Sequence, residues 1–121
     1  MAELIMLRQY NDGRGCLSVI QNEIPFLIRR VFFIEGAAGY IRGGHRHHRT
    51  RQALVCISGS CVVSNNNGIQ KEDYLLDHSS KCLLLEPEDW HTMHSFTYHA
   101  ILLVLASTTY DVADYIDEPY L

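Results

Sequence analysis

The sequence has no long apolar run. Its longest continuous apolar stretch covers residues 100–106, far shorter than the roughly 20 residues that a membrane-spanning helix requires. The first residues also lack the basic segment, apolar run and small-residue cleavage site of a signal peptide. We therefore expect a cytoplasmic protein with no membrane partner.

An excess of positive charge is also missing. The 121 residues include 10 Lys and Arg against 14 Asp and Glu, which gives a formal net charge of −4. This balance argues against a nucleic-acid partner, because binding to a phosphate backbone requires a large basic surface. Basic residues do cluster between Arg42 and Arg51. A local basic patch on an acidic chain is better suited to a small anionic ligand.

The cysteines form no C-x-x-C pair. Cys16, Cys56, Cys61 and Cys82 each lie singly in a strand-like run. We interpret them as small buried hydrophobic residues in a reducing compartment. A disulfide framework or a zinc site is the alternative.

No segment before residue 107 has a sustained apolar period of 3.6 residues. Short runs rich in Val, Ile, Leu, Tyr and Phe alternate instead with Gly, Asn, Asp and Pro, which is typical of strands and turns. Evenly spaced strands without intervening helices predict an all-β jelly-roll sandwich or barrel, built as one domain over residues 1–121. The expected strands are residues 16–20, 27–35, 52–58, 60–64, 69–76, 82–86, 93–98 and 100–106.

Asn and Gly mark the expected turns. Residues 65–68, Asn-Asn-Asn-Gly, predict a hairpin turn because Asn and Gly tolerate the positive φ of tight turns. Gly59 predicts a bend or bulge at a barrel corner. The acidic, tyrosine-rich tail, residues 108–121, is expected to form a turn or short helix packed on the barrel.

Histidines are concentrated in residues 45–48. In a strand, residues i and i+2 share a face, so His45 and His47 point one way while Arg46 and His48 point the other. Two neighbouring imidazoles can ligate a metal or act as acid and base.

The spacing of this segment resembles the first motif of the cupin superfamily. Gly39, His45, His47 and Gly59 fall in place, and Gln52 stands where that motif has a metal-ligating Glu. A neutral amide is a poor substitute for a carboxylate on a divalent cation. The resemblance implies a cupin fold, a double-stranded β-helix or jelly-roll barrel, with a degraded metal site.

The second cupin motif, Pro-x-Gly-x-x-His, is broken in this chain. Asp89 replaces the Gly, and His91 comes one residue early after Pro87. One position in a strand reverses the facing, so the spacing does not require His91 to face the pair. Three interpretations of the pair stay open: metal ligands, hydrogen-bonded wall residues, and acid–base groups that work without a metal.

Five segments spread over nearly the whole chain match one family. They are Arg30-Val-Phe-Phe-Ile, Arg42-Gly-x-His45-x-His47, Gln52-x-Leu-Val-Cys-x-Ser-Gly-Ser-Cys61, Glu86-Pro-x-x-Trp90-His91 and Leu102-Leu-Val-Leu-Ala-Ser107-x-x-Tyr110-Asp-x-x-Asp114-Tyr-Ile. With these segments the chain resembles the dTDP-sugar 3,4-ketoisomerases of the cupin superfamily, which are WxcM-like. The resemblance implies a homodimeric isomerase without metal or other cofactor. It would convert dTDP-4-keto-6-deoxyglucose to a dTDP-3-keto-6-deoxyhexose in the biosynthesis of a deoxy amino sugar, such as those of lipopolysaccharide.

Family similarity assigns the proton transfer to the His-x-His pair, here His45 and His47. A C4 ketone acidifies the C3 hydrogen, so a base can remove it to give an enediolate, and protonation at C4 leaves the ketone at C3. An imidazole is well matched to this task because its pKa is near neutral. The sequence does not show which histidine is the base. Hydroxyls available to assist include those of Tyr40, Tyr74, Tyr98 and Tyr110.

Five further residues are candidate substrate ligands. Arg42 is expected to bind the diphosphate, because related epimerases place an arginine before the catalytic histidine and a guanidinium binds phosphate oxygens bidentately. Arg30 and Arg51 are further candidate cations. Gln52 is a candidate hydrogen-bond partner of the sugar, and Trp90 a candidate stacking surface for the base. The simpler alternatives are solvated arginines, a structural amide and a core tryptophan.

Two other classes of function stay open. A non-catalytic cupin would bind a nucleotide sugar or another small anion as a sensor or accessory subunit. A metal-dependent cupin oxygenase would use His45, His47 and His91 as ligands. Metal analysis and hydrogen exchange into the sugar distinguish these functions.

Overall fold

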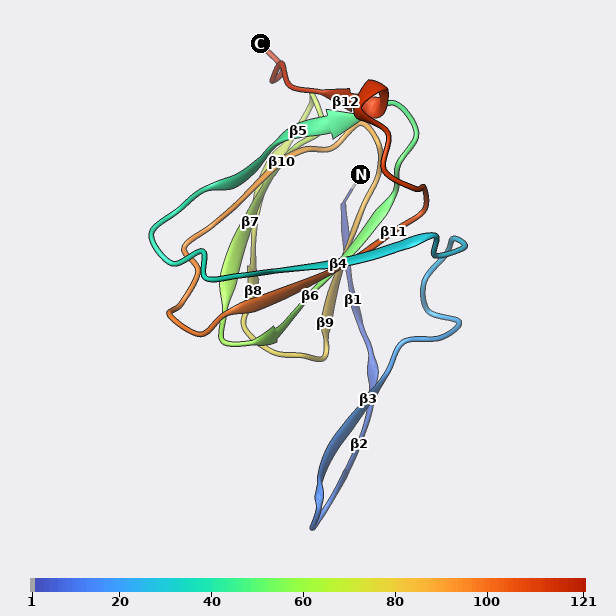
Figure 1. The fold of residues 1–121 in the computed structure, drawn as a ribbon, viewed down its shortest axis with the longest axis vertical. Helices are drawn as coiled ribbons and strands as arrows, with labels where there is room; N and C mark the ends of the chain where they lie inside the picture. Colours follow the sequence, from blue (N-terminus) through green and yellow to red (C-terminus); the bar gives the residue numbers. More distant parts are fainter. Residues whose placement is uncertain (1) are drawn as a thin grey trace.

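The computed structural model describes residues 2–121 as two antiparallel sheets packed face to face, with a separate hairpin projecting from them (Figure 1). One sheet has the strand order β1-β9-β6-β11-β4, and the other has the order β12-β5-β10-β7-β8. The prediction of an all-β jelly-roll cupin fold is confirmed. None of the helices in the described part of the chain is long and apolar enough to cross a membrane.

The strand bounds differ from the expected ones mainly at both ends of the chain. The first two strands, β1 and β2, were not expected, and β4 begins at Arg30, three residues later than predicted. The expected strand 93–98 is shifted, because Ser95 has a φ of 55° and ends β10. The elements are β1 Glu3–Met6, β2 Arg8–Asp12, β3 Gly15–Val19, β4 Arg30–Glu35, β5 Arg42–His47, β6 Gln52–Ser58, β7 Cys61–Asn66, β8 Lys71–Leu76, β9 Lys81–Leu85, β10 Trp90–His94, β11 Ile101–Ala106, the 3₁₀ helix η1 Val112–Asp114 and β12 Tyr115–Ile116.

The main core lies between the two sheets. Leu54 and Leu102 from one sheet meet Val63 and Met93 from the other, and the first three have no more than 1% of their surface exposed. A fully buried side chain of this size contributes about 1.5 to 3 kcal/mol to stability. Strand β6 is buried on both faces, because a second apolar cluster covers its outer side. This rigid strand lies next to the site described below.

The hairpin turn and the barrel corner occur where the sequence predicted them. Asn67 accepts hydrogen bonds from the backbone N–H groups of Ile69 and Gln70, at 2.9 and 2.8 Å, between β7 and β8. Gly59 joins β6 to β7 with a φ of 66°. A Cβ at Gly59 would lie 2.3 Å from Oγ1 of Thr97, so this corner requires glycine.

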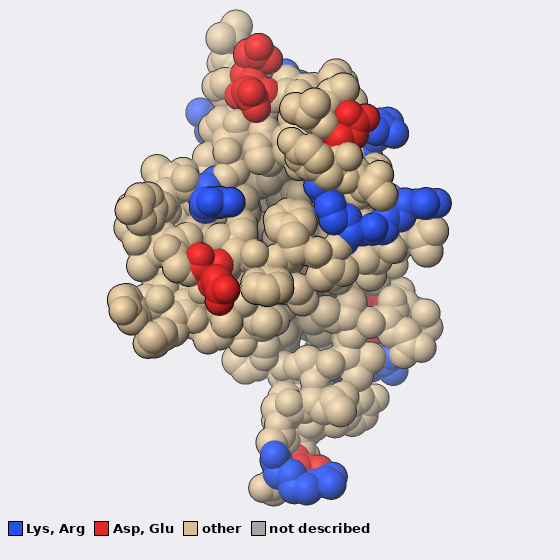
Figure 2. All heavy atoms as spheres, in the orientation of Figure 1, with Lys and Arg blue, Asp and Glu red and all other residues tan. Residues whose placement is uncertain are grey.

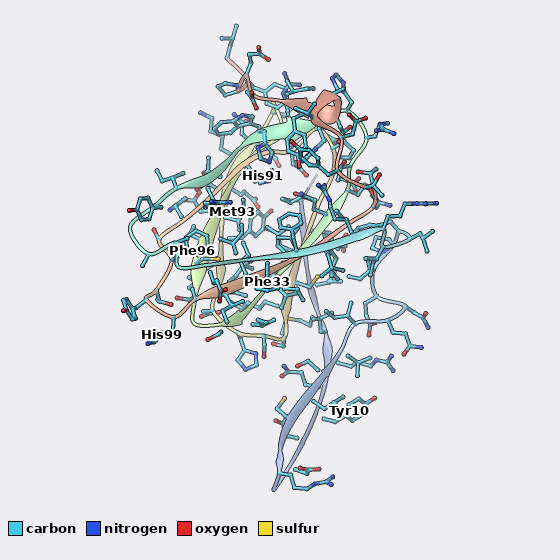
Figure 3. The ribbon with its side chains drawn as sticks, in the orientation of Figure 1. Tyr10, Phe33, His91, Met93, Phe96 and His99 are labelled. Atoms are coloured by element: carbon cyan, nitrogen blue, oxygen red, sulfur yellow. The ribbon has the colours of Figure 1, made fainter. Side chains whose placement is uncertain are left out.

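Strands β2 and β3 pair only with each other and project away from the barrel (Figure 1). Tyr10, labelled in Figure 3, and Leu17 are 58% and 60% exposed on this hairpin. Cys16 is also exposed there, which corrects the expectation that all four cysteines are buried. The local sequence is strand-like, but within residues 2–121 no other strand pairs with this hairpin. The other three cysteines are buried and all four are free.

The tail forms a short helix against the barrel, as the sequence predicted. The helix η1 is capped by Asp111, whose side chain accepts a hydrogen bond from the backbone N–H of Ala113 at 3.0 Å. The following strand β12 was not expected. It pairs Tyr115 with His47 and Ile116 with Arg46. The tail is therefore bonded directly to the strand that carries the histidines.

Candidate active site

Three histidines from two neighbouring strands meet inside the barrel. His45 and His47 lie on β5, and His91 lies on β10 directly opposite His45. The ring centroid of His45 is 5.3 Å from that of His47 and 5.3 Å from that of His91. Figure 3 shows His91 among the side chains of the barrel interior. The pair predicted from the sequence is therefore part of a group of three.

The pairing of β5 with β10 decides the direction of His91. Residues directly opposite each other in antiparallel strands share a face, so His91 must point to the same side as His45. The register shifts between His91 and Thr92. In addition, Gly43 brings the two backbones close, since a Cβ there would lie 2.9 Å from the carbonyl oxygen of His91. Spacing within one strand does not reveal either feature.

His45 faces a cavity of about 170 Å³ inside the barrel. Its ring is half-buried, and burial together with the nearby His47 lowers its pKa below the ordinary 6.5. His45 is therefore neutral at pH 7, the form that can accept a proton. The cavity is lined by Phe32, Ile34, Arg42, Gly43, His45, Gln52, Leu54, His91, Met93, Val104 and Tyr115.

His47 is buried deeper and is oriented by Asp114. Its Nδ1 lies 3.0 Å from Oδ2 of Asp114, while its Nε2 is buried and has no hydrogen-bond partner in the described chain. Burial and the charge of Arg30 lower the pKa of His47, the Asp114 carboxylate acts to raise it, and the net result is a lowered pKa. Because a carboxylate only accepts, Nδ1 carries the proton and Nε2 presents a lone pair. The arrangement fits His47 as a proton acceptor.

Asp114 was not singled out from the sequence as a site residue. Burial acts to raise its pKa, but hydrogen bonds from Thr50, the Arg49 backbone and His47 outweigh this, so that its pKa is lowered. The N–H of Arg49 donates to Oδ1 at 2.8 Å, and the hydroxyl of Thr50 donates to Oδ2. Asp114 therefore stays ionised. The acidic tail was visible in the sequence, but its contact with residue 47 depends on the pairing of β12 with β5.

Tyr115 is the second residue that sequence reasoning missed. Its ring centroid lies 4.7 Å from that of His45 and 4.6 Å from that of His47. It also lines the cavity. None of the four tyrosines considered from the sequence is among the cavity-lining residues; the phenol at the histidines comes from the tail.

His91 differs from the other two histidines in its surroundings. It is completely buried, and this burial lowers its pKa to about 4. Its Nδ1 lies 3.0 Å from the backbone carbonyl of Asp89, so Nδ1 donates and the ring is fixed. Asp89, which replaces the cupin glycine, is itself buried and accepts from Asn65 at 3.1 Å and from the backbone of Glu86 at 2.8 Å. His91 is a neutral part of the cavity wall near pH 7.

Three of the five candidate substrate ligands lie at or beside the cavity. Arg42 and Gln52 line it. Arg30 has a buried Nε without a hydrogen-bond partner in the described residues, and its guanidinium lies 5.4 Å from the ring centroid of Phe32, a cavity residue. Figure 2 shows Lys or Arg side chains on both sides of the region where Figure 3 places His91. This end of the barrel can therefore attract an anion.

The structure does not bring Arg51 and Trp90 to the cavity. The guanidinium of Arg51 donates to both carboxylate oxygens of Glu86, each at 3.0 Å, and to the carbonyl of Pro25 at 2.9 Å. Trp90 precedes the inward His91, so it points outward, and its indole N–H donates to the carbonyl of Asp117 at 3.2 Å. We leave both residues out of the proposed substrate site.

The histidine cavity is not the largest hollow of the molecule. An open depression of about 580 Å³ is lined by residues from β4, from the end of β6 and from the segment before β11. Its titratable residues, Glu35, Tyr98 and His99, are all exposed. The smaller cavity is lined by the buried His91 and the half-buried His45, whose pKa values are both lowered, and groups with shifted pKa values are concentrated at functional sites.

The described side chains around the cavity do not form a metal-binding site. Over residues 2–121, no group of three or more His, Cys, Asp or Glu side chains has an arrangement that could hold a metal ion. Gln52, which stands where cupins have a ligating Glu, is buried in the cavity wall and supplies no negative charge.

Comparison with known proteins connects this geometry to one group of enzymes. A curated protein of Aneurinibacillus thermoaerophilus, TDP-4-oxo-6-deoxy-alpha-D-glucose-3,4-oxoisomerase, is 38% identical over 117 residues, covering 94% of this chain and 84% of that protein. The WlaRB TDP-quinovose 3,4-ketoisomerase of Campylobacter jejuni is 37% identical, with a TM-score of 0.92 over 97% of this chain and 92% of that one.

A solved complex of a related enzyme holds a nucleotide sugar. It is a mutant of the 3,4-ketoisomerase QdtA from Thermoanaerobacterium thermosaccharolyticum with TDP-4-keto-6-deoxyglucose. QdtA in this complex is 33% identical, with a TM-score of 0.91 over 97% of this chain and 87% of that one. The family model described as FdtA, WxcM-like, C-terminal matches residues 1–120. The chain therefore belongs to the FdtA family of WxcM-like C-terminal proteins.

Proposed function

We propose that this protein is a 3,4-ketoisomerase that converts dTDP-4-keto-6-deoxyglucose to a dTDP-3-keto-6-deoxyhexose, in the biosynthesis of a deoxy amino sugar. The observation that carries the proposal is a neutral imidazole, His45, at a cavity inside the barrel, with the neutral imidazole of His47 next to it. His45 faces the cavity, and His47 is held by Asp114 so that Nε2 presents a lone pair. The family and the named activities of its members supply the substrate class.

The proposed reaction moves two protons and needs no external oxidant. His45, the pair member that lines the cavity, removes the C3 hydrogen of the sugar, and the electron pair of that C–H bond forms the enediolate with the C4 carbonyl. The proton then adds to C4, and the proton of the C3 hydroxyl is transferred to the C4 oxygen, so that C3 becomes the ketone and C4 the hydroxyl. His47 is the second proton acceptor. Positioned general acid–base groups of this kind contribute roughly 10² to 10⁴ in rate.

The nucleotide end of the substrate requires cations. Arg42 lines the cavity, and the buried Nε of Arg30 lacks a partner among the described residues. We assign the diphosphate to these two arginines, because a guanidinium pairs with phosphate oxygens through directed hydrogen bonds. We assign Gln52 to the sugar, because its amide lies on the cavity wall.

We further propose that the protein acts as a cytoplasmic homodimer with one domain per chain. An isolated two-stranded hairpin is only marginally stable in water, yet β2 and β3 project from the barrel with Tyr10 and Leu17 exposed. A second copy of the chain is the partner we assign to this hairpin. The four free cysteines support a reducing compartment. Measurement of the molar mass in solution tests the dimer, and a monomer would contradict it.

Incubation with dTDP-4-keto-6-deoxyglucose in deuterated water tests the reaction. We expect deuterium in the sugar ring and formation of a 3-keto product. The variants H45N and H47N should lower turnover by about 10² to 10⁴, whereas H99N, which changes an exposed histidine outside the cavity, should not. Full activity of both H45N and H47N would disprove the site, and absence of exchange in the wild-type protein would disprove the reaction.

The same experiments separate the two alternatives. A non-catalytic nucleotide-sugar-binding cupin would bind the substrate in calorimetry, but the sugar would incorporate no deuterium from the solvent. A metal-dependent oxygenase is supported by one observation, the convergence of His91 with His45 and His47. It would contain stoichiometric metal after purification and lose activity on chelation.

A further inference from the structure

The last residues of the chain lie across the outer side of the active site. Figure 1 shows the C-terminal segment running from β12 along β5 at one end of the barrel. Strand β12 has only two residues, and its Tyr115 faces the histidines while Asp114 immediately before it binds His47. Hydrogen bonds from Arg49 and Thr50 hold the Asp114 carboxylate from the loop after β5, whereas β12 itself ends after two residue pairs. The segment after β12 is therefore the second support that holds Asp114 and Tyr115 in place.

Residues 117–120 are held by side chains from the outer face of the second sheet. Arg46 donates from Nε to the carbonyl of Glu118 at 3.3 Å, and its guanidinium lies 4.3 Å from the ring centroid of Tyr120. The indole N–H of Trp90 donates to the carbonyl of Asp117 at 3.2 Å. The hydroxyl of Tyr120 donates to the carbonyl of Glu88 at 2.7 Å. These contacts come from β5, from β10 and from the loop before β10.

The side chains that hold the tail alternate with the histidines of the site. Arg46 lies between His45 and His47, and Trp90 lies next to His91. Because successive side chains of a strand point to opposite faces, the same two strands bind the tail on the outside and present imidazoles on the inside. Tyr120 also packs over Gly68, where a Cβ would lie 3.2 Å from its ring.

We propose that residues 117–120 form a C-terminal clamp in which Arg46, Trp90 and Tyr120 position Asp114 and Tyr115 against His45 and His47. These clamp residues act through the tail and have no contact with the cavity. The inference rests on the proposed isomerase function for its kinetic readout only. A mutation far from the chemistry that misplaces a catalytic group by about 1 Å can lower the rate roughly 10²-fold. A loosened clamp should therefore lower kcat, while KM stays unchanged because the proposed substrate ligands Arg42 and Arg30 are not affected.

Two sets of variants test the clamp kinetically. Deletion of residues 118–121 and the substitution R46A should each lower kcat about tenfold to hundredfold and change KM by less than about twofold. Deletion of Leu121 alone is the matched control, because this residue is exposed and makes none of the clamp contacts. R46K, which can still donate to Glu118, should recover most of kcat.

A double-mutant cycle distinguishes a clamp from separate structural effects. If Arg46 and Tyr120 act through the same segment, R46A and Y120A together should cost scarcely more in kcat than either alone. Additive losses would overturn the clamp, as would full kcat in the deletion variant. A kcat loss explained wholly by a smaller folded fraction in thermal melting would also overturn it.

Proton NMR of the free protein tests the clamp without turnover. The Nδ1 proton of His47, held by Asp114, should give a slowly exchanging downfield resonance in the wild type. This resonance should weaken in R46A and in the deletion variant, and should persist in the protein that lacks only Leu121. An unchanged resonance in all variants would overturn the clamp. An inactive wild type would instead contradict the proposed function and leave this measurement valid.

Discussion

The two faces of β5 perform different tasks with alternating residues. On the inner face, His45 and His47 are desolvated, and burial lowers the pKa of both. On the outer face, Arg46 contacts the tail at the protein surface. The comparison shows that burial, rather than residue type, makes a side chain of this segment suitable for acid–base chemistry. His48 follows directly, is exposed, and has the same side chain as the two site histidines.

The largest effect is expected from substitution of Asp114, which binds His47 on the inner face. The substitution D114N removes the charge that orients His47 and should lower kcat about 10²-fold. Since the carboxylate raises the pKa of His47, the acid limb of the kcat profile should also move to lower pH. D111N is the control, because asparagine also caps a helix and Asp111 lies outside the cavity. Equal kcat in D114N and the wild type would contradict the role of Asp114.

A second effect concerns stability at acid pH. The pKa of His91 is about 4 when folded and about 6.5 in an unfolded chain. The unfolded state therefore binds more protons between these values, and the free energy of unfolding should fall by about 3 kcal/mol as the pH drops from 6.5 to 4. Urea unfolding at several pH values measures this slope. H91Q should flatten the slope, and an equally steep slope in that variant would assign it to other groups.

A third, smaller effect sharpens the assignment of the base. Because the pKa of both His45 and His47 is lowered, the acid limb of the kcat profile should lie at lower pH than the limb that an ordinary imidazole would give. On that limb kcat should fall about tenfold for each pH unit. A kcat that instead rises as the pH falls through this range would show that the protonated imidazole is the active form.

The smallest effect comes from the outer side of the same segment. H48A changes a histidine one residue beyond His47, yet kcat and the melting temperature should stay at wild-type values because its side chain is exposed. A loss of activity as large as that of H47N would show that the inward-facing and outward-facing residues of this segment do not have separate roles.

Local patterns predicted much of the barrel. The strands β6 to β9 and β11 were recognised from apolar runs between turn residues, and the turn at Asn67 and the corner at Gly59 from their conformational tolerance. Strand β3 was also predicted, but its partner β2 was not, and no other strand of the described chain pairs with this exposed hairpin. Strand β10 was placed too late because Ser95 adopts a positive φ that no sequence pattern indicated.

The sequence by itself determined the His-x-His pair, its shared face and the family to which the chain belongs. These follow from the period of a strand and from spacing along the chain. Only the tertiary structure decided that His91 joins the pair, that Asp114 orients His47 and that Tyr115 lies beside both histidines. These contacts depend on which strands pair and in which register. That pairing is set by packing of the whole barrel and leaves no local signature in the sequence.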